Sequence, residues 1–318
     1  MNKHFNLNES FNLQFHAAED NVVTSAMMAK AREVDFVNRF SDSILKKLLE
    51  ALGVTRKIPM MEGTTMYVYT TTGTLQSGEN IAEGDIIPLS KYQRNKVAVG
   101  DISLDKWRKA VTAEAIKKSG YQEAVNETDK KMIADIQKTI RTKFFNFLSG
   151  IVQSASGTEG QEGYVPAVGV TVNGSTLQEV LAKSWGQLQV LFENDTVEAV
   201  HFINPLTIAN YLSTATITTQ NAFGMTYIED FLGLGTVVMN SQVTVNTVYS
   251  TAKENLVMYY LTMGGDVARA FNLTADDTGY IGMHTSQTDN RAQIETLVMA
   301  GIRFLVEYAN GVVKGTIS

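Results

Sequence analysis

The most regular hydrophobic pattern of the chain lies in residues 119–150. Apolar side chains recur there at steps of three, four and seven residues, the spacing of one buried helix face: Val125, Met132, Ile133, Ile136, Ile140, Phe144 and Phe147. The opposite face carries charges of alternating sign four residues apart, Glu127 with Lys131 and Lys131 with Asp135, which predicts ion pairs in contact with solvent. A helix of this length measures about 45 Å at about 1.5 Å per residue. It serves either as a beam from which other parts project or as a long helix of an ordinary two-domain protein.

Capping signals predict where this helix begins and ends. Ser119 stands three residues before Gln122, a capping-box pattern, and Gly150 suits the left-handed turn that ends many helices. Residues 21–52 repeat the helical spacing of apolar side chains nearer the N-terminus. Residues 1–20 are rich in Asn and have no clear period, which predicts an extended arm that is ordered only when something holds it.

Between the two helices the pattern changes to that of β-strands. Residues 65–70 and 96–102 are rich in aromatic and β-branched side chains, which predicts a pair of strands joined by a long connection. Such a ribbon has little core of its own, so another surface of the chain or of a neighbouring subunit must cover it. Candidate intersubunit contacts are therefore its charged and apolar side chains, although the charges also suit a solvated face: Glu79, Glu83, Asp85, Ile86, Ile87, Lys91, Arg94 and Lys96.

The remaining segments predict a mixed α and β region. Residues 105–118 predict a short helix that leads into the long one, and residues 154–163 predict a loop rich in Gly and Ser. After residue 168, helices are expected behind the Thr176–Glu179 capping pair and behind Asn204-Pro205. Strands are expected at 197–203, 236–240, 255–261, 296–306 and 312–317, with Asn310-Gly311 as the turn between the last two.

Composition limits the classes of function. A chain of 318 residues suggests about two domains of roughly 150 residues each. The net charge of −6 and the pI of about 5.4 argue against tight direct binding of nucleic acid, which needs clustered Lys and Arg. The polar N-terminus indicates no signal peptide, and no apolar run approaches the ~20 residues of a membrane helix. The chain has no cysteine, which excludes disulfides and thiolate chemistry.

No segment carries a motif for catalysis, a cofactor or a metal. The four histidines are scattered, and His201 lies in an apolar strand, where a hydrogen-bonded core histidine is expected. Asp276-Asp277 lacks the repeated acids of a calcium loop and fits a solvated turn. Gly233-Leu234-Gly235 precedes a strand and is no dinucleotide fingerprint. We therefore predict no catalytic, cofactor-binding or metal-binding residue, and an enzyme is the less favoured class.

Four short motifs occur in an order that resembles a known family. They are Gly78-Glu79 with Glu83-Gly84-Asp85-Ile86-Ile87-Pro88-Leu89-Ser90-Lys91, Val200-His201-Phe202-Ile203-Asn204-Pro205, Tyr249-Ser250-Thr251-Ala252-Lys253-Glu254-Asn255-Leu256, and Asn310-Gly311-Val312-Val313-Lys314-Gly315. Together with the order of arm, ribbon, long helix and C-terminal strands, they resemble the major capsid proteins of tailed bacteriophages. The resemblance implies an α+β, Hong Kong 97-like capsid fold with an N-terminal arm, an extended β-ribbon loop, a long spine helix, a peripheral domain and an axial domain.

The resemblance also assigns each segment to a part of that fold. It implies an N-terminal arm and helix at 1–57, an extended loop at 58–104, a peripheral domain with the spine helix at 105–167, an axial domain at 168–263, return strands of the peripheral domain at 264–306, and a C-terminal strand returning to the axial domain at 307–318.

The implied function is that of a structural subunit. Copies of the chain would assemble as pentamers and hexamers into an icosahedral shell, the virion capsid, in the host cytoplasm. The shell would enclose double-stranded DNA without sequence-specific binding, and no membrane is involved. A portal protein is an implied partner, and a separate scaffolding protein is expected because no long segment precedes the arm. The type member of the family cross-links a ribbon lysine to an asparagine of a neighbouring subunit. In this chain no local pattern pairs Lys91 or Lys96 with Asn290 or Asn310, so we expect no covalent cross-link between subunits.

Three other interpretations stay open at the level of sequence. The first is a shell protein of an encapsulin-like nanocompartment that holds a cargo enzyme. The second is a two-domain α/β enzyme whose catalytic residues lie far apart in the sequence. The third is a phage tail or adhesion component, which would share the ribbon but hardly the long helix.

Overall fold

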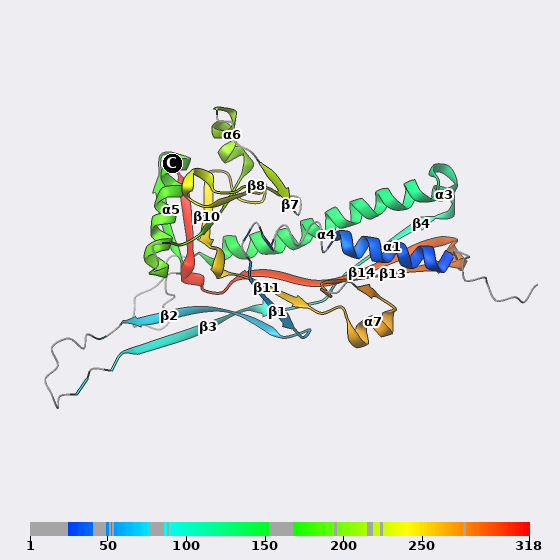
Figure 1. The fold of residues 1–318 in the computed structure, drawn as a ribbon, viewed down its shortest axis with the longest axis horizontal. Helices are drawn as coiled ribbons and strands as arrows, with labels where there is room; N and C mark the ends of the chain where they lie inside the picture. Colours follow the sequence, from blue (N-terminus) through cyan, green and yellow to red (C-terminus); the bar gives the residue numbers. More distant parts are fainter. Residues whose placement is uncertain are drawn as a thin grey trace, which may run out of the picture.

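The computed structural model describes residues 25–40, 49–50, 52, 54–74, 76, 86–87, 89–152, 168–193, 196–214, 219–222, 225–275 and 278–318. Two sheets, a separate two-stranded ribbon and one long helix make up this part of the chain (Figure 1). The predicted arm at 1–20, the loop at 154–163 and the Asp276-Asp277 turn lie outside the described residues.

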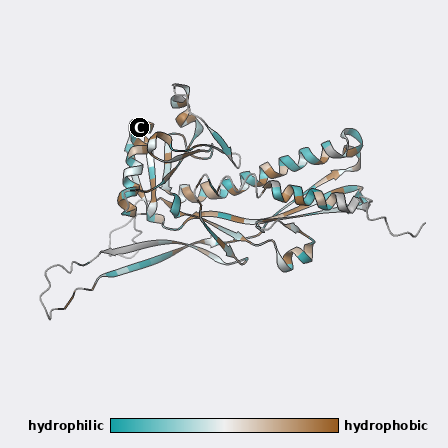
Figure 2. Ribbon diagram, in the orientation of Figure 1, coloured by the Kyte–Doolittle hydropathy of each residue, from teal (hydrophilic) through white to brown (hydrophobic). Residues whose placement is uncertain are grey.

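The long helix, α4, spans Tyr121–Ile151 and has 31 residues, which confirms the prediction. Its predicted apolar face is buried from Val125 to Phe144, and Phe145 and Leu148 extend that face. Hydrophobic and hydrophilic residues alternate along the helix in Figure 2, as an amphipathic helix requires. On the outer face Lys131 pairs with Asp135 at 2.7 Å as predicted.

The predicted caps of α4 are wrong at both ends. Ser119 is the last residue of a preceding short helix, α3 (Ala113–Ser119), and therefore cannot cap the next one. Gly120 separates the two helices with φ at 78° and donates its N–H to the Ile116 carbonyl. At the other end the helix continues through Gly150 to Ile151 and is capped by Val152.

The helix predicted at 105–118 is also wrong over most of its length. Residues Asp105–Thr112 form strand β4, and only α3 is helical. Along β4 exposed residues alternate with less exposed ones, the period of two that a strand requires. Pairing with strand β14 (Gln293–Val306) stabilises the strand instead of the predicted helix, and Val298 of β14 lies opposite Trp107.

A six-stranded sheet lies beside α4. Its order is β1-β11-β14-β13-β12, with β4 paired to β14 off this path. Helix α1 (Ser25–Phe40) packs on β13 and β12, beside α4, and the short α7 (Gly265–Phe271) lies between β11 and β12 in the chain. The remaining strands are β1 (Arg56–Met60), β11 (Leu256–Leu261), β12 (Thr274–Ala275) and β13 (Ile281–Thr288).

The second sheet has seven strands, in the order β5-β15-β10-β6-β9-β8-β7. Helix α5 (Leu177–Phe192) packs on β15, β10 and β5, and it begins at Thr176, whose hydroxyl accepts from the Glu179 N–H at 3.2 Å as the capping pair predicts. Helix α6 (Pro205–Thr214) begins at the predicted Asn-Pro step. The strands are β5 (Val170–Gly174), β6 (Ala199–Ile203), β7 (Gln220–Ala222), β8 (Met225–Ile228), β9 (Thr236–Met239), β10 (Thr247–Ala252) and β15 (Val312–Ile317).

The chain passes between the two sheets three times: between β4 and β5 by way of α3 and α4, after β10, and after β14. The turn predicted at Asn310-Gly311 does not fold β14 and β15 into a hairpin, because β15 pairs with β10 and β5 in the other sheet. A short 3₁₀ turn at Ala309–Gly311 makes the crossing. Gly311 is required there, since a Cβ would lie 2.5 Å from the Phe192 ring.

Aromatic side chains fill the joint between α4 and both sheets. Phe144 lies 5.3 Å from Phe202 of β6 and 6.1 Å from Phe304 of β14, measured between ring centroids. Phe145 adds a contact of 5.6 Å to Phe202. All three contacts are edge-to-face, the arrangement that aromatic rings favour in cores. The helix and the two sheets therefore share one packed core.

Candidate assembly surface

The ribbon consists of β2 (Thr65–Thr74) and β3 (Lys91–Asp101), paired antiparallel, as the sequence predicts. It is a two-stranded sheet of its own that points away from the rest of the described chain (Figure 1). Its register shifts between Met66 and Tyr67, so Val99 bulges out of the ladder, and such a bulge increases local twist. Ile58, placed in the extended loop by the sequence, lies in β1, which pairs with β11.

Among the ribbon residues whose burial the structure describes, the buried ones lie at the base. Met66 and Val68 are 5% and 3% exposed, whereas β3 is exposed from Lys91 to Ala98. Farther out, the described residues Ile86, Ile87 and Leu89 are 94%, 73% and 77% exposed. Large apolar side chains grouped on one projecting segment are typical of a surface that binds a partner.

The structure places five of the eight predicted contact residues. Ile86 and Ile87 lie exposed near the ribbon tip, and Lys91 begins β3. Arg94 and Lys96 instead contact the chain's own residues at the ribbon base. Glu79, Glu83 and Asp85 lie outside the described residues. Whether any of the eight contacts a neighbour stays a prediction.

The contacts of Arg94 and Lys96 are with aromatic rings. The Arg94 guanidinium carbon lies 3.8 Å from the centroid of Tyr69, and the Lys96 ammonium 4.6 Å from that of Tyr67. Arg94 also donates to the Glu307 carboxylate at 3.3 Å. Sequence reasoning missed Glu307 because 213 residues separate it from Arg94, and no local pattern links the two.

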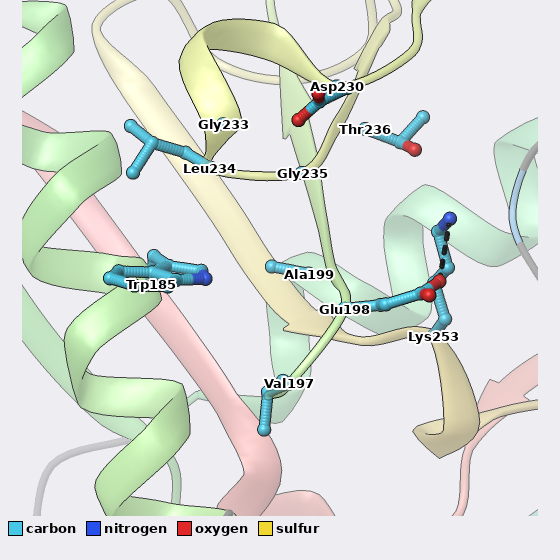
Figure 3. A pocket seen from close by; sticks show the side chains of 10 residues that line it. All are labelled: Trp185, Val197, Glu198, Ala199, Asp230, Gly233, Leu234, Gly235, Thr236 and Lys253. Atoms are coloured by element: carbon cyan, nitrogen blue, oxygen red, sulfur yellow. Dashed lines mark ion pairs between the residues drawn. The ribbon is translucent and has the colours of Figure 1, made fainter. Parts of the chain in front are cut away.

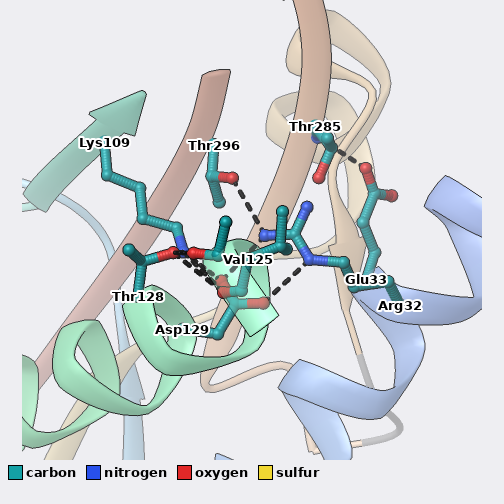
Figure 4. Close-up of polar contacts among 9 residues, drawn as sticks. Arg32, Glu33, Lys109, Val125, Thr128, Asp129, Thr285 and Thr296 are labelled. Carbon is teal, nitrogen blue, oxygen red and sulfur yellow. Dashed lines mark hydrogen bonds and ion pairs between the residues drawn. The ribbon is translucent and has the colours of Figure 1, made fainter. Parts of the chain in front are cut away.

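A buried charge cluster holds α1 against α4 and β4; we call it the clamp (Figure 4). Arg32 donates to both carboxylate oxygens of Asp129 at 2.8 Å and to the Thr296 hydroxyl at 3.2 Å. Lys109 of β4 pairs with the same carboxylate and donates to the Thr128 hydroxyl at 2.7 Å. Asp129 is 3% exposed, so this anion is buried between two cations.

Burial and charge oppose each other in the clamp. Burial by itself lowers the pKa of Arg32, but the hydrogen bonds and negative charge of Asp129 raise that pKa above its ordinary value. For Lys109 burial prevails and lowers the pKa of the ammonium despite Asp129. The cluster therefore depends on the Asp129 carboxylate.

A second buried carboxylate lies one residue further along α1. Glu33 is 2% exposed and accepts from the Thr285 N–H at 2.5 Å and from the Thr274 hydroxyl. Lys30 reaches it at 3.2 Å. These bonds tie α1 to β12 and β13, beside the clamp (Figure 4).

His201 is a hydrogen-bonded core histidine, as predicted. It is fully buried, with Nδ1 2.7 Å from the Ser250 hydroxyl and Nε2 3.1 Å from the Leu234 carbonyl. A carbonyl only accepts, so Nε2 carries the proton and Nδ1 accepts from Ser250. Burial lowers the pKa of His201 to about 4, although the bond to Leu234 acts in the opposite direction. The ring is neutral near pH 7.

An open pocket of about 280 Å³ lies between α5 and the start of β6 (Figure 3). Trp185 lines one side, and Glu198 and Lys253 form an ion pair of 3.1 Å at another. This pair neutralises its own charge, and the lining contains no nucleophile beside a base. We therefore assign no catalytic role to this pocket.

Two features are absent from the residues that the structure describes. No group of three or more His, Cys, Asp or Glu side chains there is arranged to hold a metal ion. None of the described helices is long and apolar enough to span a membrane.

No protein-family model matches the chain, and no curated protein sequence matches it. Solved structures do. A capsid chain of cyanophage A-1(L) has 11% identity and a TM-score of 0.51, over 96% of this chain and 97% of that chain. A capsid chain of a native GTA particle has 11% identity and a TM-score of 0.50, over 95% and 94%. A chain of the holo-SrpI encapsulin complex from Synechococcus elongatus PCC 7942 has 11% identity and a TM-score of 0.45, over 98% and 96%.

The two capsid likenesses extend over nearly the whole chain, so they concern the complete arrangement of sheets, ribbon and long helix rather than one shared motif. The predicted fold class is thereby confirmed: the chain has the α+β, Hong Kong 97-like fold.

Proposed function

We propose that this chain is a structural subunit of an icosahedral protein shell and, more specifically, the major capsid protein of a tailed bacteriophage, enclosing double-stranded DNA. Its role is to assemble rather than to catalyse. The proposal rests on the capsid-like fold over nearly the whole chain together with the ribbon, which exposes apolar side chains away from the chain's own core.

The ribbon is the observation that carries the proposal. Ile86, Ile87 and Leu89 are between 73% and 94% exposed, and each apolar side chain of this size gains about 1.5–3 kcal/mol when it is fully buried. An isolated two-stranded ribbon is marginally stable in water. A neighbouring copy that covers the ribbon supplies both the burial and the support.

The two sheets support an assignment of domains. The six-stranded sheet with α1 and α4 is the proposed peripheral domain, and the seven-stranded sheet with α5 and α6 is the proposed axial domain. The segment boundaries expected from the sequence serve as the first approximation. One adjustment follows from pairing, since β11 (Leu256–Leu261) joins the six-stranded sheet, whereas the sequence-based segment 168–263 assigns it to the axial domain.

The proposed partners are other copies of the chain, arranged as pentamers and hexamers in the shell. The net charge of −6 suits a container that encloses DNA without holding it tightly. A portal protein and a separate scaffolding protein complete the proposal, and the resemblance to the phage family supports both. The virion is the proposed location, after assembly in the host cytoplasm.

Electron microscopy of purified protein, with a sizing column beside it, tests this function. We expect closed shells or rings of five and six copies. Deleting residues 72–91 removes the outer ribbon and should leave a soluble monomer that forms no shells, because the two sheets and α4 keep their core. Shells from the deletion variant would contradict the role of the ribbon. Exclusively monomeric wild-type protein, both when purified at every concentration and when recovered from infected cells that supply a scaffolding protein, would contradict the shell itself.

The contents of the particles decide between the two kinds of shell. Double-stranded DNA inside particles from infected cells supports the phage capsid. A self-assembled particle that carries a host protein instead favours the encapsulin-like compartment.

A further inference from the structure

The ribbon meets the rest of the chain beside the crossing from β14 to β15, at Glu307 and Tyr308. Asn255, which is 1% exposed, fixes this short segment. Its side chain accepts from the Tyr308 N–H at 2.8 Å and donates to the Tyr308 carbonyl at 3.0 Å. Its own carbonyl accepts from the Glu307 N–H at 2.9 Å. Asn255 therefore fixes the backbone at this point independently of the ribbon.

Both strands of the ribbon contact this fixed segment. Tyr69 of β2 donates its N–H to the Glu307 carbonyl at 2.7 Å. Arg94 of β3 places its guanidinium against the Tyr69 ring and 5.7 Å from the centroid of Tyr308, and it donates to one oxygen of the Glu307 carboxylate. Arg56 of β1 pairs with the other oxygen. One carboxylate thus joins β1, the ribbon and the crossing.

Packing at the ribbon base leaves one side of the ribbon open at this point. An open cavity of about 390 Å³ lies between the ribbon base and the six-stranded sheet. Met66 and Tyr67 line it from the ribbon, and Ile58 and Tyr259 line it from the sheet. Directed contacts across this open side therefore help to set the angle of the ribbon.

We propose that Arg94 and Glu307 form a latch that fixes the direction of the ribbon, and that Arg94 is thereby a positioning residue for assembly. This inference rests on the proposed shell function. A ribbon that is held at one angle loses less conformational freedom when it binds a neighbouring copy, so assembly begins at a lower protein concentration. Arg suits the latch because its planar guanidinium stacks on rings while it donates to a carboxylate, which Lys cannot reproduce.

Hydrogen exchange of the unassembled subunit, followed by mass spectrometry, tests the latch without any shell. Arg94→Ala should make amides of Thr65–Thr74 and Lys91–Asp101 exchange about tenfold faster, the sum of one weak ion pair and one cation–π contact. Amides of α4 should not change. Glu307→Gln should act in the same direction, and Arg94→Lys should lie between the wild type and Arg94→Ala. Lys91→Ala is the matched control, an exposed cation on the same strand but away from Glu307.

Assembly of the same variants tests the positioning role. Arg94→Ala should raise the protein concentration at which shells first form by about tenfold. Unchanged exchange in the ribbon of Arg94→Ala, or equally faster exchange in α4, would overturn the latch. Faster exchange with an unchanged assembly concentration would overturn the positioning role. If the wild-type chain forms no shell either alone or in infected cells, the shell function fails, while the exchange experiment still decides whether the latch exists.

Discussion

Two charged joints connect N-terminal segments to the rest of the chain, and they differ in burial. In the clamp, the Arg32 and Asp129 side chains are 12% and 4% exposed. In the latch, the Arg94 and Glu307 side chains are 50% and 11% exposed. The clamp is surrounded by packed helices and strands, whereas an open cavity lies beside the latch.

The difference teaches how one chain holds two segments with joints of unequal strength. A buried charge that loses its partner is strongly destabilising, so the clamp has one permitted arrangement. A half-exposed ion pair contributes only about 0–1 kcal/mol, so the latch favours one direction of the ribbon without contributing much to the stability of the fold. The helix that needs a fixed place is therefore held by the clamp, and the ribbon that we propose to meet other copies is oriented by the latch.

The largest expected effect comes from breaking the clamp. Asp129→Asn leaves Arg32 and Lys109 as two buried cations without an anion, and we expect the free energy of unfolding to fall by about 3–5 kcal/mol. Denaturant unfolding followed by circular dichroism measures the loss.

Asp135→Asn is the matched control, six residues further along the same helix. Its pair with Lys131 is exposed, so the loss should not exceed about 0.5 kcal/mol. Equal losses in the two variants would contradict the distinction between buried and exposed charges in this chain.

A smaller effect is expected from His201, a buried group that stays neutral. Its folded-state pKa of about 4 lies below the unfolded value of about 6.5. The unfolded chain therefore takes up the proton first as the pH falls, and the free energy of unfolding falls through the window from pH 6.5 to pH 4. Since one pKa unit corresponds to about 1.4 kcal/mol, the loss reaches about 3 kcal/mol.

Comparison with His201→Gln isolates this contribution, because carboxylates also titrate in the window. The variant should lose less stability than the wild type between pH 6.5 and pH 4 in chemical denaturation. Parallel curves for the two proteins would show that the imidazole is not the group responsible.

Patterns within one segment account for what the sequence predicts well. The buried face of α4, the pairing of β2 with β3 and the start of α5 at Thr176 all follow from periods or caps that a few neighbouring residues carry. The solvated pair of Lys131 with Asp135 follows for the same reason. The order of these segments, rather than any single one, allowed the fold to be predicted.

Contacts between distant segments account for what the sequence does not predict. The helical interpretation of 105–118 fails because β14 supplies a partner strand 187 residues away, the separation of Arg108 from Glu295. The clamp joins Arg32 to Asp129 across 97 residues, and the latch joins Arg94 to Glu307. Each of these arginines has several acidic residues elsewhere in the sequence as possible partners. Only the fold determines which of them lies within reach.

Hydrogen exchange compared between free subunits and assembled shells tests the central claim most directly. The account predicts that amides of the ribbon gain protection on assembly, while those of α1 and α4, held by the clamp and the shared core, stay as they are in the free subunit. Ribbon amides with the same protection in both states would contradict the claim that this segment serves a neighbouring copy.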